Sequence, residues 1–380
     1  MKDFLIRKIF PVLILSILLI PFYLFLANYS DNAINENRVL AKKPSLESVF
    51  EFPKYLNQFD SYFADNFPFR AKAIFALSYI KFFTFGVSAH ENVLIGKENM
   101  MYLFTKNSGD TIGDYRGINY FNAEELNQIE ANILTRMELL KKKNIKFYLV
   151  FAPNKESIYP ENIPNSMKKY KNRNRFDQLV EHLKKNKEIP FVSLKDNLLK
   201  EKVVHPYLFY HYDTHWNKLG AYFGYQGILD IMRSDFKEIL IHPLSDFEVK
   251  EEFRNLNGDL IRQIGIGDFL SDRYIEVNPK FKRKAIQETE TNLEAHNYKY
   301  TTSEKNLPSA YFWCDSFLMY GPRDLLAETF NDSYFVWLGM PHDPERIPFS
   351  KINIIVFEMA ERYIDLLSNP VKDSSKPWIF

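Results

Sequence analysis

Five short apolar runs, rich in β-branched and aromatic residues, alternate along this chain with segments whose apolar positions have helical spacing. The runs lack the polar alternation of a strand with one exposed face, so each is expected to be buried on both faces. They lie at 145–153, 189–194, 309–316, 333–339 and 352–358. The helical segments lie at 122–142, 175–185, 218–233, 322–330 and 359–367. This alternation predicts an α/β domain with an open parallel sheet flanked by helices.

The segment 246–303 fits this alternation least well. Its basic run KFKRK at 280–284 is expected to be a solvated face. Over the whole chain, 49 Lys and Arg nearly balance 48 Asp and Glu, so no overall field attracts nucleic acid. The single cysteine, Cys314, allows no internal disulfide. We therefore predict a fold held by burial, with no nucleic-acid partner and no cofactor.

The N-terminus carries a separate signal, an apolar run at 9–27 in which Ser16 is the one small polar residue. A helix of this length rises about 28 Å, which is enough to cross a bilayer. Lys2, Arg7 and Lys8 precede the run, so the short N-terminus is expected in the cytoplasm. These features predict a single-pass protein of the cell (inner) membrane whose remaining chain faces the periplasm or the exterior.

A cleaved signal peptide is the alternative interpretation of the same run. Cleavage after Ala27 would leave Phe25 three residues before the cut, where signal peptidases prefer a small residue. A retained signal anchor, in contact with the lipid bilayer, is therefore the favoured prediction.

We predict four parts along the chain. They are a cytoplasmic N-terminus at 1–8, the transmembrane anchor at 9–27, a helical segment at 28–77 and the main domain at 78–380. Within 28–77, apolar positions at three- and four-residue steps from Leu56 to Phe67 predict an amphipathic helix. That helix is expected to end near Asn66, because Pro68 disfavours helical backbone at the residue before it.

Polar residues follow four of the five predicted strands. Ligands of open parallel sheets sit beyond the carboxyl ends of the strands, so these positions are candidates for a site. They are Asn154 and Lys155, Asp315 and Ser316, His342 and Asp343, and Glu358 and Arg362.

The stretch DTHW at 213–216 places a carboxylate two residues before a histidine, just ahead of a predicted helix. Ser316 stands at a predicted strand-to-helix turn. A serine hydroxyl becomes nucleophilic when a base removes its proton, and a carboxylate orients that base and stabilises its cation. Asp213, His215 and Ser316 supply residue types for these three roles. Backbone N–H groups at the start of the helix after Ser316 would stabilise an oxyanion.

Several segments together resemble the SGNH-hydrolase-like domain of the alginate O-acetylation proteins, the AlgJ and AlgX family, and their polysaccharide-acetylating relatives. The segments are ENRVLAKKP (36–44), FDSYFADNFPFR (59–70), DYRGI (114–118), APNKESIYPENIP (152–164), DTHWNKLGAY (213–222), NGDL (257–260), CDSF (314–317) and FEMAERYI (357–364). NGDL alone carries no information, whereas DTHW and DSF are specific in combination.

This resemblance implies an SGNH-hydrolase-like, flavodoxin-like fold with Ser316 as nucleophile, His215 as general base and Asp213 as its orienting carboxylate. The order Asp, His, Ser along the chain is permuted relative to ordinary SGNH esterases, in which the serine block comes first. Cys314 stands where many relatives have Gly or Arg. We expect it to change packing below the nucleophile without abolishing activity.

The family also implies a reaction, transfer of an acetyl group through an acetyl-serine to a hydroxyl of a cell-surface or exported polysaccharide. The acetyl donor is expected to be delivered by a membrane-bound O-acyltransferase. Trp216 is expected either to stack on a sugar ring or to pack under the site. Asn154 is expected either to donate to the oxyanion or to cap the turn after its strand.

Other hypotheses remain open on the sequence. His205, His211, Asp213 and His215 crowd one segment and are a candidate metal site, although the catalytic Glu of a zinc-protease helix is absent and no metal is predicted. Cys314 is a rival nucleophile. The same triad would also serve a carbohydrate acetylesterase. A non-catalytic polysaccharide-binding or assembly subunit is the last alternative.

Overall fold

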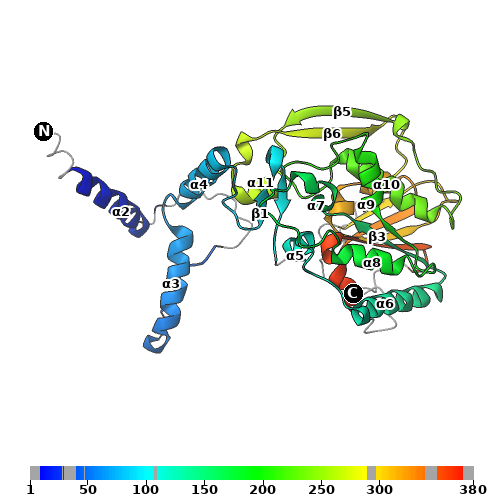
Figure 1. The fold of residues 1–380 in the computed structure, drawn as a ribbon, viewed down its shortest axis with the longest axis horizontal. Coiled ribbons are helices and arrows are strands. Elements are labelled where there is room, and N and C mark those ends of the chain that lie inside the picture. The colour runs from blue at the N-terminus through cyan, green and yellow to red at the C-terminus, as the bar shows by residue number, and fades with distance from the viewer. Residues whose placement is uncertain are drawn as a thin grey trace. The chain divides into compact units, whose positions relative to one another are not determined.

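The computed structural model describes residues 9–27, 29, 40–46, 48–106, 109–288, 297–338 and 349–370. The chain divides into two compact units (Figure 1). One comprises Met1–His90 with Ile261–Ile266, and the other comprises Glu91–Leu260 with Gly267–Phe380. The described residues do not test the predicted domain boundary after residue 77. The predicted cytoplasmic N-terminus at 1–8 lies outside the described residues.

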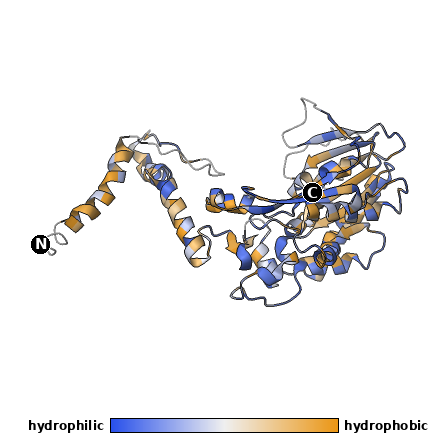
Figure 2. Ribbon diagram, turned by 90° about the horizontal axis from the view of Figure 1, so that it is seen from above, coloured by the Kyte–Doolittle hydropathy of each residue, from blue (hydrophilic) through white to orange (hydrophobic). Residues whose placement is uncertain are grey.

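The first unit contains α2 (Phe10–Leu26), the 3₁₀ turn η2 (Val49–Glu51), α3 (Phe52–Asn66) and α4 (Arg70–Phe85). α3 ends at Asn66, as predicted from Pro68. Figure 2 shows α2, beside the N-terminus, hydrophobic along its length. Its 17 residues rise only about 26 Å. Among the described residues no helix is both long and apolar enough to cross a membrane, so the predicted anchor at 9–27 is not supported.

The second unit is built on one seven-stranded sheet in the order β4-β3-β11-β9-β10-β8-β7. Five strands are parallel, and they coincide with the five predicted apolar runs. They are β3 (Lys146–Ala152), β4 (Phe191–Ser193), β9 (Ala310–Cys314), β10 (Asp332–Trp337) and β11 (Ile354–Ala360). The predicted α/β architecture is confirmed.

The order of these five strands is a permuted flavodoxin order. Counted from β9, in the sequence β9, β10, β11, β3, β4, the sheet has the order 2-1-3-4-5, which is that of flavodoxin-like folds. The order reverses between β9 and β11, which pair directly, and ligands of such sheets bind at this switch point. The carboxyl end of β9 is therefore the position where the topology places a ligand.

The sheet is not wholly parallel, which corrects the prediction. β8 (Tyr298–Thr301) pairs antiparallel with β10, and β7 (Ile286–Glu288) pairs antiparallel with β8. The segment that fitted the pattern least also forms a separate antiparallel ribbon of β5 (Phe247–Arg254) and β6 (Asp272–Pro279). All residues of β5 after Phe247 are exposed, which explains why its sequence lacks an apolar run.

Helices cover both faces of the sheet, so alternate side chains of one strand enter two different cores. In β3, Tyr148 and Val150 belong to one core, whereas Leu149 and Phe151 belong to the other. α6 (Ala123–Lys141) and α8 (Arg175–Leu183) contribute to the second core. Burial on both faces explains why the strand sequences show so little alternation.

This unit contains further strands, helices and 3₁₀ segments. They are β1 (Val93–Ile95), β2 (Met101–Leu103), α5 (Thr111–Arg116), α7 (Lys155–Ile158), α9 (Leu194–Lys202), α10 (Lys218–Met232), α12 (Ser316–Tyr320), α13 (Arg323–Ala327) and the 3₁₀ segments η3 (Lys97–Asn99), η4 (Pro160–Asn162), η5 (Leu244–Asp246) and η6 (Gly267–Phe269). α11 (Asp259–Ile264) begins in this unit. The predicted helix at 359–367 is wrong, because β11 continues to Ala360 and is followed by the 3₁₀ segment η8 (Glu361–Ser368).

Candidate active site

The loop that carries His215 is fixed by backbone pairing and by the start of α10. Phe209 and Trp216 form an antiparallel bridge, and the Tyr210 N–H donates to the His215 carbonyl oxygen. Asn217 caps α10, because its side-chain oxygen accepts hydrogen bonds from two N–H groups of the first turn at 3.0 Å each. His215 therefore stands two residues before the cap, on backbone with little freedom.

Ser316 is the first residue of α12 and follows the carboxyl end of β9 by two residues. Asp315 caps this helix by accepting from the Phe317 N–H at 2.8 Å. Its other oxygen accepts from the N–H of Ala360, at the end of neighbouring β11, at 2.8 Å. Ser316 thus lies at the switch point between β9 and β11. The two hydrogen bonds that Asp315 accepts, from α12 and from β11, fix the turn that carries Ser316.

The three predicted triad residues form one hydrogen-bonded chain. His215 Nδ1 lies 2.6 Å from Asp213 Oδ1, and His215 Nε2 lies 2.7 Å from Ser316 Oγ. The His215 N–H also donates to Asp213 Oδ1 at 2.9 Å. The structure therefore brings together side chains 101 residues apart in the sequence, in the order carboxylate, imidazole and hydroxyl.

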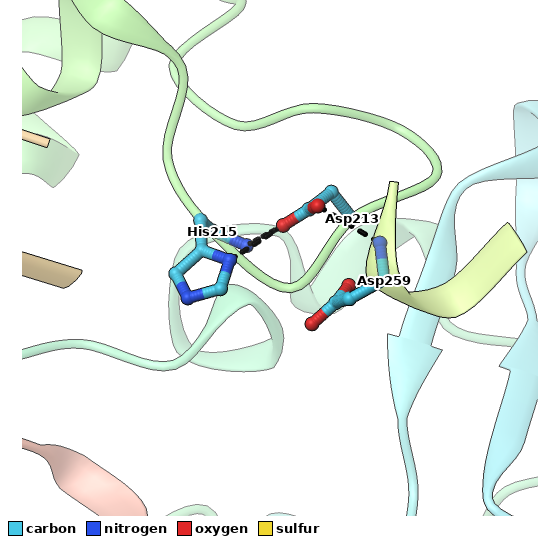
Figure 3. Close-up of side chains that lie close together, drawn as sticks. All are labelled: Asp213, His215 and Asp259. Carbon is cyan, nitrogen blue, oxygen red and sulfur yellow. Dashed lines mark hydrogen bonds and ion pairs between the residues drawn. The ribbon is translucent and has the colours of Figure 1, made fainter. Parts of the chain in front are cut away.

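Asp259 lies beside Asp213 and forms a hydrogen bond with it (Figure 3). Its backbone N–H donates to Asp213 Oδ2 at 2.9 Å, so both Asp213 oxygens are engaged. Its own carboxylate accepts from the Thr214 N–H at 2.7 Å and from the Thr214 hydroxyl at 2.6 Å. Asp259 belongs to the NGDL segment, whose residues had no predicted role. Its role could not be read from spacing, because it acts through a backbone N–H.

The charges of the site favour a cationic imidazole. Burial lowers the pKa of His215, but the Asp213 carboxylate outweighs burial and raises that pKa above 6.5. Burial raises the pKa of Asp213, but the His215 cation and the N–H donors bring it well below its ordinary value. Burial and the Asp213 charge together raise the pKa of Asp259. Of the two carboxylates, Asp213 thus stabilises the imidazolium more strongly than Asp259 does.

Trp216 is buried, with 3% of its surface exposed, and it packs under the site. The indole N–H donates to the carbonyl oxygen of Phe317, the residue after Ser316, at 3.0 Å. A Cβ at Gly224 would lie 2.9 Å from the indole, and one at Gly321 would lie 2.3 Å from it. Of the two expectations for Trp216, this position favours packing over sugar stacking.

The substitution Trp216→Phe tests that packing role. The variant loses the hydrogen bond to the Phe317 carbonyl and leaves space where the indole lay. We expect the free energy of unfolding to fall by about 2 kcal/mol, measured by urea denaturation. A variant as stable as the parent would contradict the packing role.

Asn154 is also buried, just beyond β3. Its backbone N–H donates to Glu361 Oε2 at 3.1 Å, and its side-chain oxygen accepts from the Arg362 guanidinium at 3.3 Å. The side chain does not cap α7. Its oxygen thus accepts from Arg362, and the donor group of this side chain is its amide NH₂.

A buried carboxyl, Glu358, lies beneath the nucleophile turn. Its Oε2 accepts from the Asp315 N–H at 3.0 Å, and it is fully buried. Burial, with the nearby Asp315 charge, raises the pKa of Glu358 well above 4.5. Folding therefore favours the protonated form of Glu358, and this carboxyl supports the turn that presents Ser316.

Glu358→Gln tests this protonation state. The folded parent keeps a proton that the unfolded chain releases above about pH 4.5, so its stability falls by up to about 1.4 kcal/mol per pH unit from there towards the raised pKa. Glutamine has no such proton. We expect the unfolding free energy of the parent, relative to that of the variant, to be lower at about pH 8 than at about pH 5. Urea denaturation of both proteins at the two pH values measures this change. A difference that does not change with pH would show an ionised Glu358.

The remaining candidates from the sequence have other positions. Lys155 is buried and donates to the carbonyls of Met101 and His211, and burial lowers its pKa to about 8. Cys314 is fully buried, which raises the pKa of its thiol well above 9 and makes it a poor nucleophile. His342 and Asp343 lie outside the described residues.

The four residues of the alternative metal-site hypothesis do not come together in the structure. His211 pairs with Asp272 at 2.9 Å and His205 lies against Phe223, so neither joins Asp213 and His215. Among the described residues, Asp213, His215 and Asp259 are close enough to share a cation, with one ligand atom of each within 4.8 Å of the others. Their hydrogen bonds to one another and to Thr214 already use these atoms.

Comparison with known proteins assigns the chain to a family. The family described as "SGNH hydrolase-like domain, acetyltransferase AlgX" matches residues 113–302, half of the chain. The chain belongs to the AlgX family. Asp213, His215 and Asp259 lie inside the matched range, whereas Ser316 lies beyond it. The structure, rather than the family match, joins Ser316 to the site.

Solved structures are similar to this chain at low sequence identity, and two of them, PatB1 and a DHHW family protein, share its fold. PatB1 from Bacillus cereus is 15% identical with a TM-score of 0.52, and the match covers 72% of this chain and 96% of PatB1. A DHHW family protein from Eubacterium siraeum is 14% identical with a TM-score of 0.50, covering 72% and 91%. The O-acetyltransferase domain of Pseudomonas putida AlgJ is 14% identical with a TM-score of 0.46, covering 74% and 94%. No protein of curated function matches the sequence significantly.

Proposed function

We propose that this protein is an O-acetyltransferase that passes an acetyl group through Ser316 to a hydroxyl of a cell-surface or exported polysaccharide. The observation that carries the proposal is the hydrogen-bonded chain from Asp213 through His215 to Ser316 at the switch point of the sheet. Membership of the AlgX family supports acetyl transfer as the reaction.

In the first half-reaction, His215 Nε2 takes the hydroxyl proton as Ser316 Oγ attacks the acetyl carbonyl carbon of the donor. Asp213 holds Nδ1 and stabilises the imidazolium. The donor's leaving oxygen then departs with the proton from Nε2. Acetyl-Ser316 and a neutral imidazole remain.

In the second half-reaction, a sugar hydroxyl gives its proton to Nε2 and attacks the acetyl carbon. The ester bond to Ser316 Oγ breaks, and Oγ recovers the proton from His215. The negative charge on the carbonyl oxygen needs donors in both steps. We assign this role to the Ser316 N–H and to the Asn154 amide, since the Phe317 N–H already donates to Asp315.

The donor and the location belong to the same proposal. An acetyl group supplied by a membrane-bound O-acyltransferase, and a site facing the periplasm or exterior, follow from the family resemblance and from the basic, then apolar, N-terminal sequence. Residues 1–8 lie outside the described structure. Fractionation of cells, with protease added to intact spheroplasts, tests the location: degradation of the protein supports it, and full protection contradicts it.

Hydrolysis is the alternative fate of the same acetyl-serine, because water and a sugar hydroxyl compete for one intermediate. The test uses p-nitrophenyl acetate as donor, with and without oligosaccharide acceptors, and mass spectrometry of protein and sugar. Acetyl on Ser316 together with acetylated sugar supports the proposal. Free acetate alone, at saturating acceptor, would identify an esterase.

A further inference from the structure

Tyr320 lies one helical turn from the nucleophile. α12 runs from Ser316 to Tyr320, and side chains four residues apart lie on the same face of a helix. The Tyr320 ring centroid is 6.5 Å from that of His215, at an interplanar angle of 88°. Tyr320 is 51% exposed, whereas its neighbours Phe317, Leu318 and Met319 are buried.

A second ring extends this surface. Trp337, the last residue of β10, is half-buried, and its ring centroid is 5.7 Å from that of Tyr320. The Lys218 ammonium donates to the Tyr320 carbonyl oxygen at 2.9 Å, which ties the end of α12 to the start of α10. Tyr320 is therefore held in place by its backbone and by Trp337 while its ring remains accessible.

Exposure alone does not make a binding site, because single exposed aromatic residues are common. The position of this ring is what matters. A second substrate must bring a hydroxyl to His215 Nε2, and Tyr320 is an exposed ring beside the His215 imidazole. An aromatic ring offers an apolar face to the C–H face of a sugar and leaves the sugar hydroxyls in water.

We propose that Tyr320, backed by Trp337, is the acceptor subsite, on which one sugar ring of the polysaccharide stacks so that a hydroxyl reaches His215. The inference rests on the proposed function and adds the residues that select a sugar over water. A stacked sugar raises the local concentration of hydroxyl at the acetyl-serine. Trp216, the ring expected from the sequence, is buried and does not compete for this role.

The experiment compares Tyr320→Ala, Tyr320→Phe and a control, Tyr170→Ala. Tyr170 is 62% exposed and stacks on Arg116. The acceptors are pentamers of β-1,4-linked glucose, N-acetylglucosamine and mannuronate. Each variant is measured for acetate release from p-nitrophenyl acetate without acceptor and for the acceptor KM in transfer. Binding of the pentamers is measured separately by calorimetry in the inactive Ser316→Ala background.

We expect Tyr320→Ala to raise the acceptor KM, and the calorimetric Kd in the Ser316→Ala background, about tenfold. Acceptor-free acetate release should stay within about twofold of the parent. Tyr320→Phe and Tyr170→Ala should behave as the parent, because Phe keeps the ring face and Tyr170 forms no part of the proposed subsite. A raised acceptor KM and Kd together with unchanged acetate release would show that Tyr320 binds the acceptor and does not position Ser316.

Three results would overturn the subsite. They are an unchanged KM and Kd in Tyr320→Ala, an equal loss of acetate release and transfer, and no binding of any pentamer at millimolar concentration. Failure of the proposed function looks different. If the parent binds a pentamer through Tyr320 but releases only acetate, the sugar subsite stands and the enzyme is an esterase.

Discussion

Ser316→Ala is expected to lower acetyl turnover by about 10⁴- to 10⁶-fold and to leave no acetylated protein. The alanine has no oxygen to attack the donor carbonyl, and His215 Nε2 loses its partner at 2.7 Å. The fold should persist, because the contacts that hold this turn come from Asp315 and from backbone groups. Acetate release from p-nitrophenyl acetate and the mass of the 316-containing peptide measure the effect.

Cys314→Ala is the matched control for this substitution. Cys314 lies two residues earlier, at the end of β9, and is the rival nucleophile, but its thiol is buried. We expect this variant to keep both turnover and acetylation of Ser316. Loss of activity in Cys314→Ala with retention in Ser316→Ala would reverse the assignment.

Asp213→Asn should lower turnover by about 10³- to 10⁴-fold with little change in structure. The amide cannot stabilise a cationic imidazole, and its NH₂ group favours the wrong tautomer of His215. The substitution also changes the pH profile. Parental activity requires neutral His215, so it should rise with pH through a midpoint above about 6.5, because Asp213 raises the pKa of His215. Without the carboxylate, burial dominates and that midpoint should fall.

Asp259→Asn is the comparison for Asp213→Asn. Asp259 holds Asp213 through its backbone N–H, which the substitution keeps, and the asparagine oxygen still accepts from Thr214. We expect a loss within about tenfold and a pH midpoint that remains above that of Asp213→Asn. Equal losses in both variants would mean that Asp213 is not the carboxylate that orients the base.

The strands of the parallel sheet were predictable because each is buried on both faces, so its apolar run is continuous. β7, β8 and the β5–β6 ribbon were not predictable by the same signal. β5 is exposed after Phe247, and the pairing of β8 with β10 joins segments about thirty residues apart. The end of β11 was predicted wrongly because Met359 and Ala360 continue the strand, whereas the spacing of apolar residues predicted a helix from Met359.

For the site, the sequence indicated the residue types and the family resemblance indicated their roles. The 2.7 Å contact between His215 and Ser316 depends on long-range topology that spacing does not encode. Asp259 was missed because its contribution to Asp213 is a backbone hydrogen bond. Tyr320 was missed because its nearness to His215 follows from the short helix that Ser316 begins.

The position of β11 has a consequence for biosynthesis. This strand comes last among those of the sheet, yet it lies between β3 and β9 and supplies the Ala360 N–H that secures Asp315. On the ribosome, the histidine loop emerges long before the strand that completes the serine turn. A nascent chain lacking residues 354–360 carries a base without a secured nucleophile. Under the proposed function, the site is therefore complete only after β11 has entered the sheet.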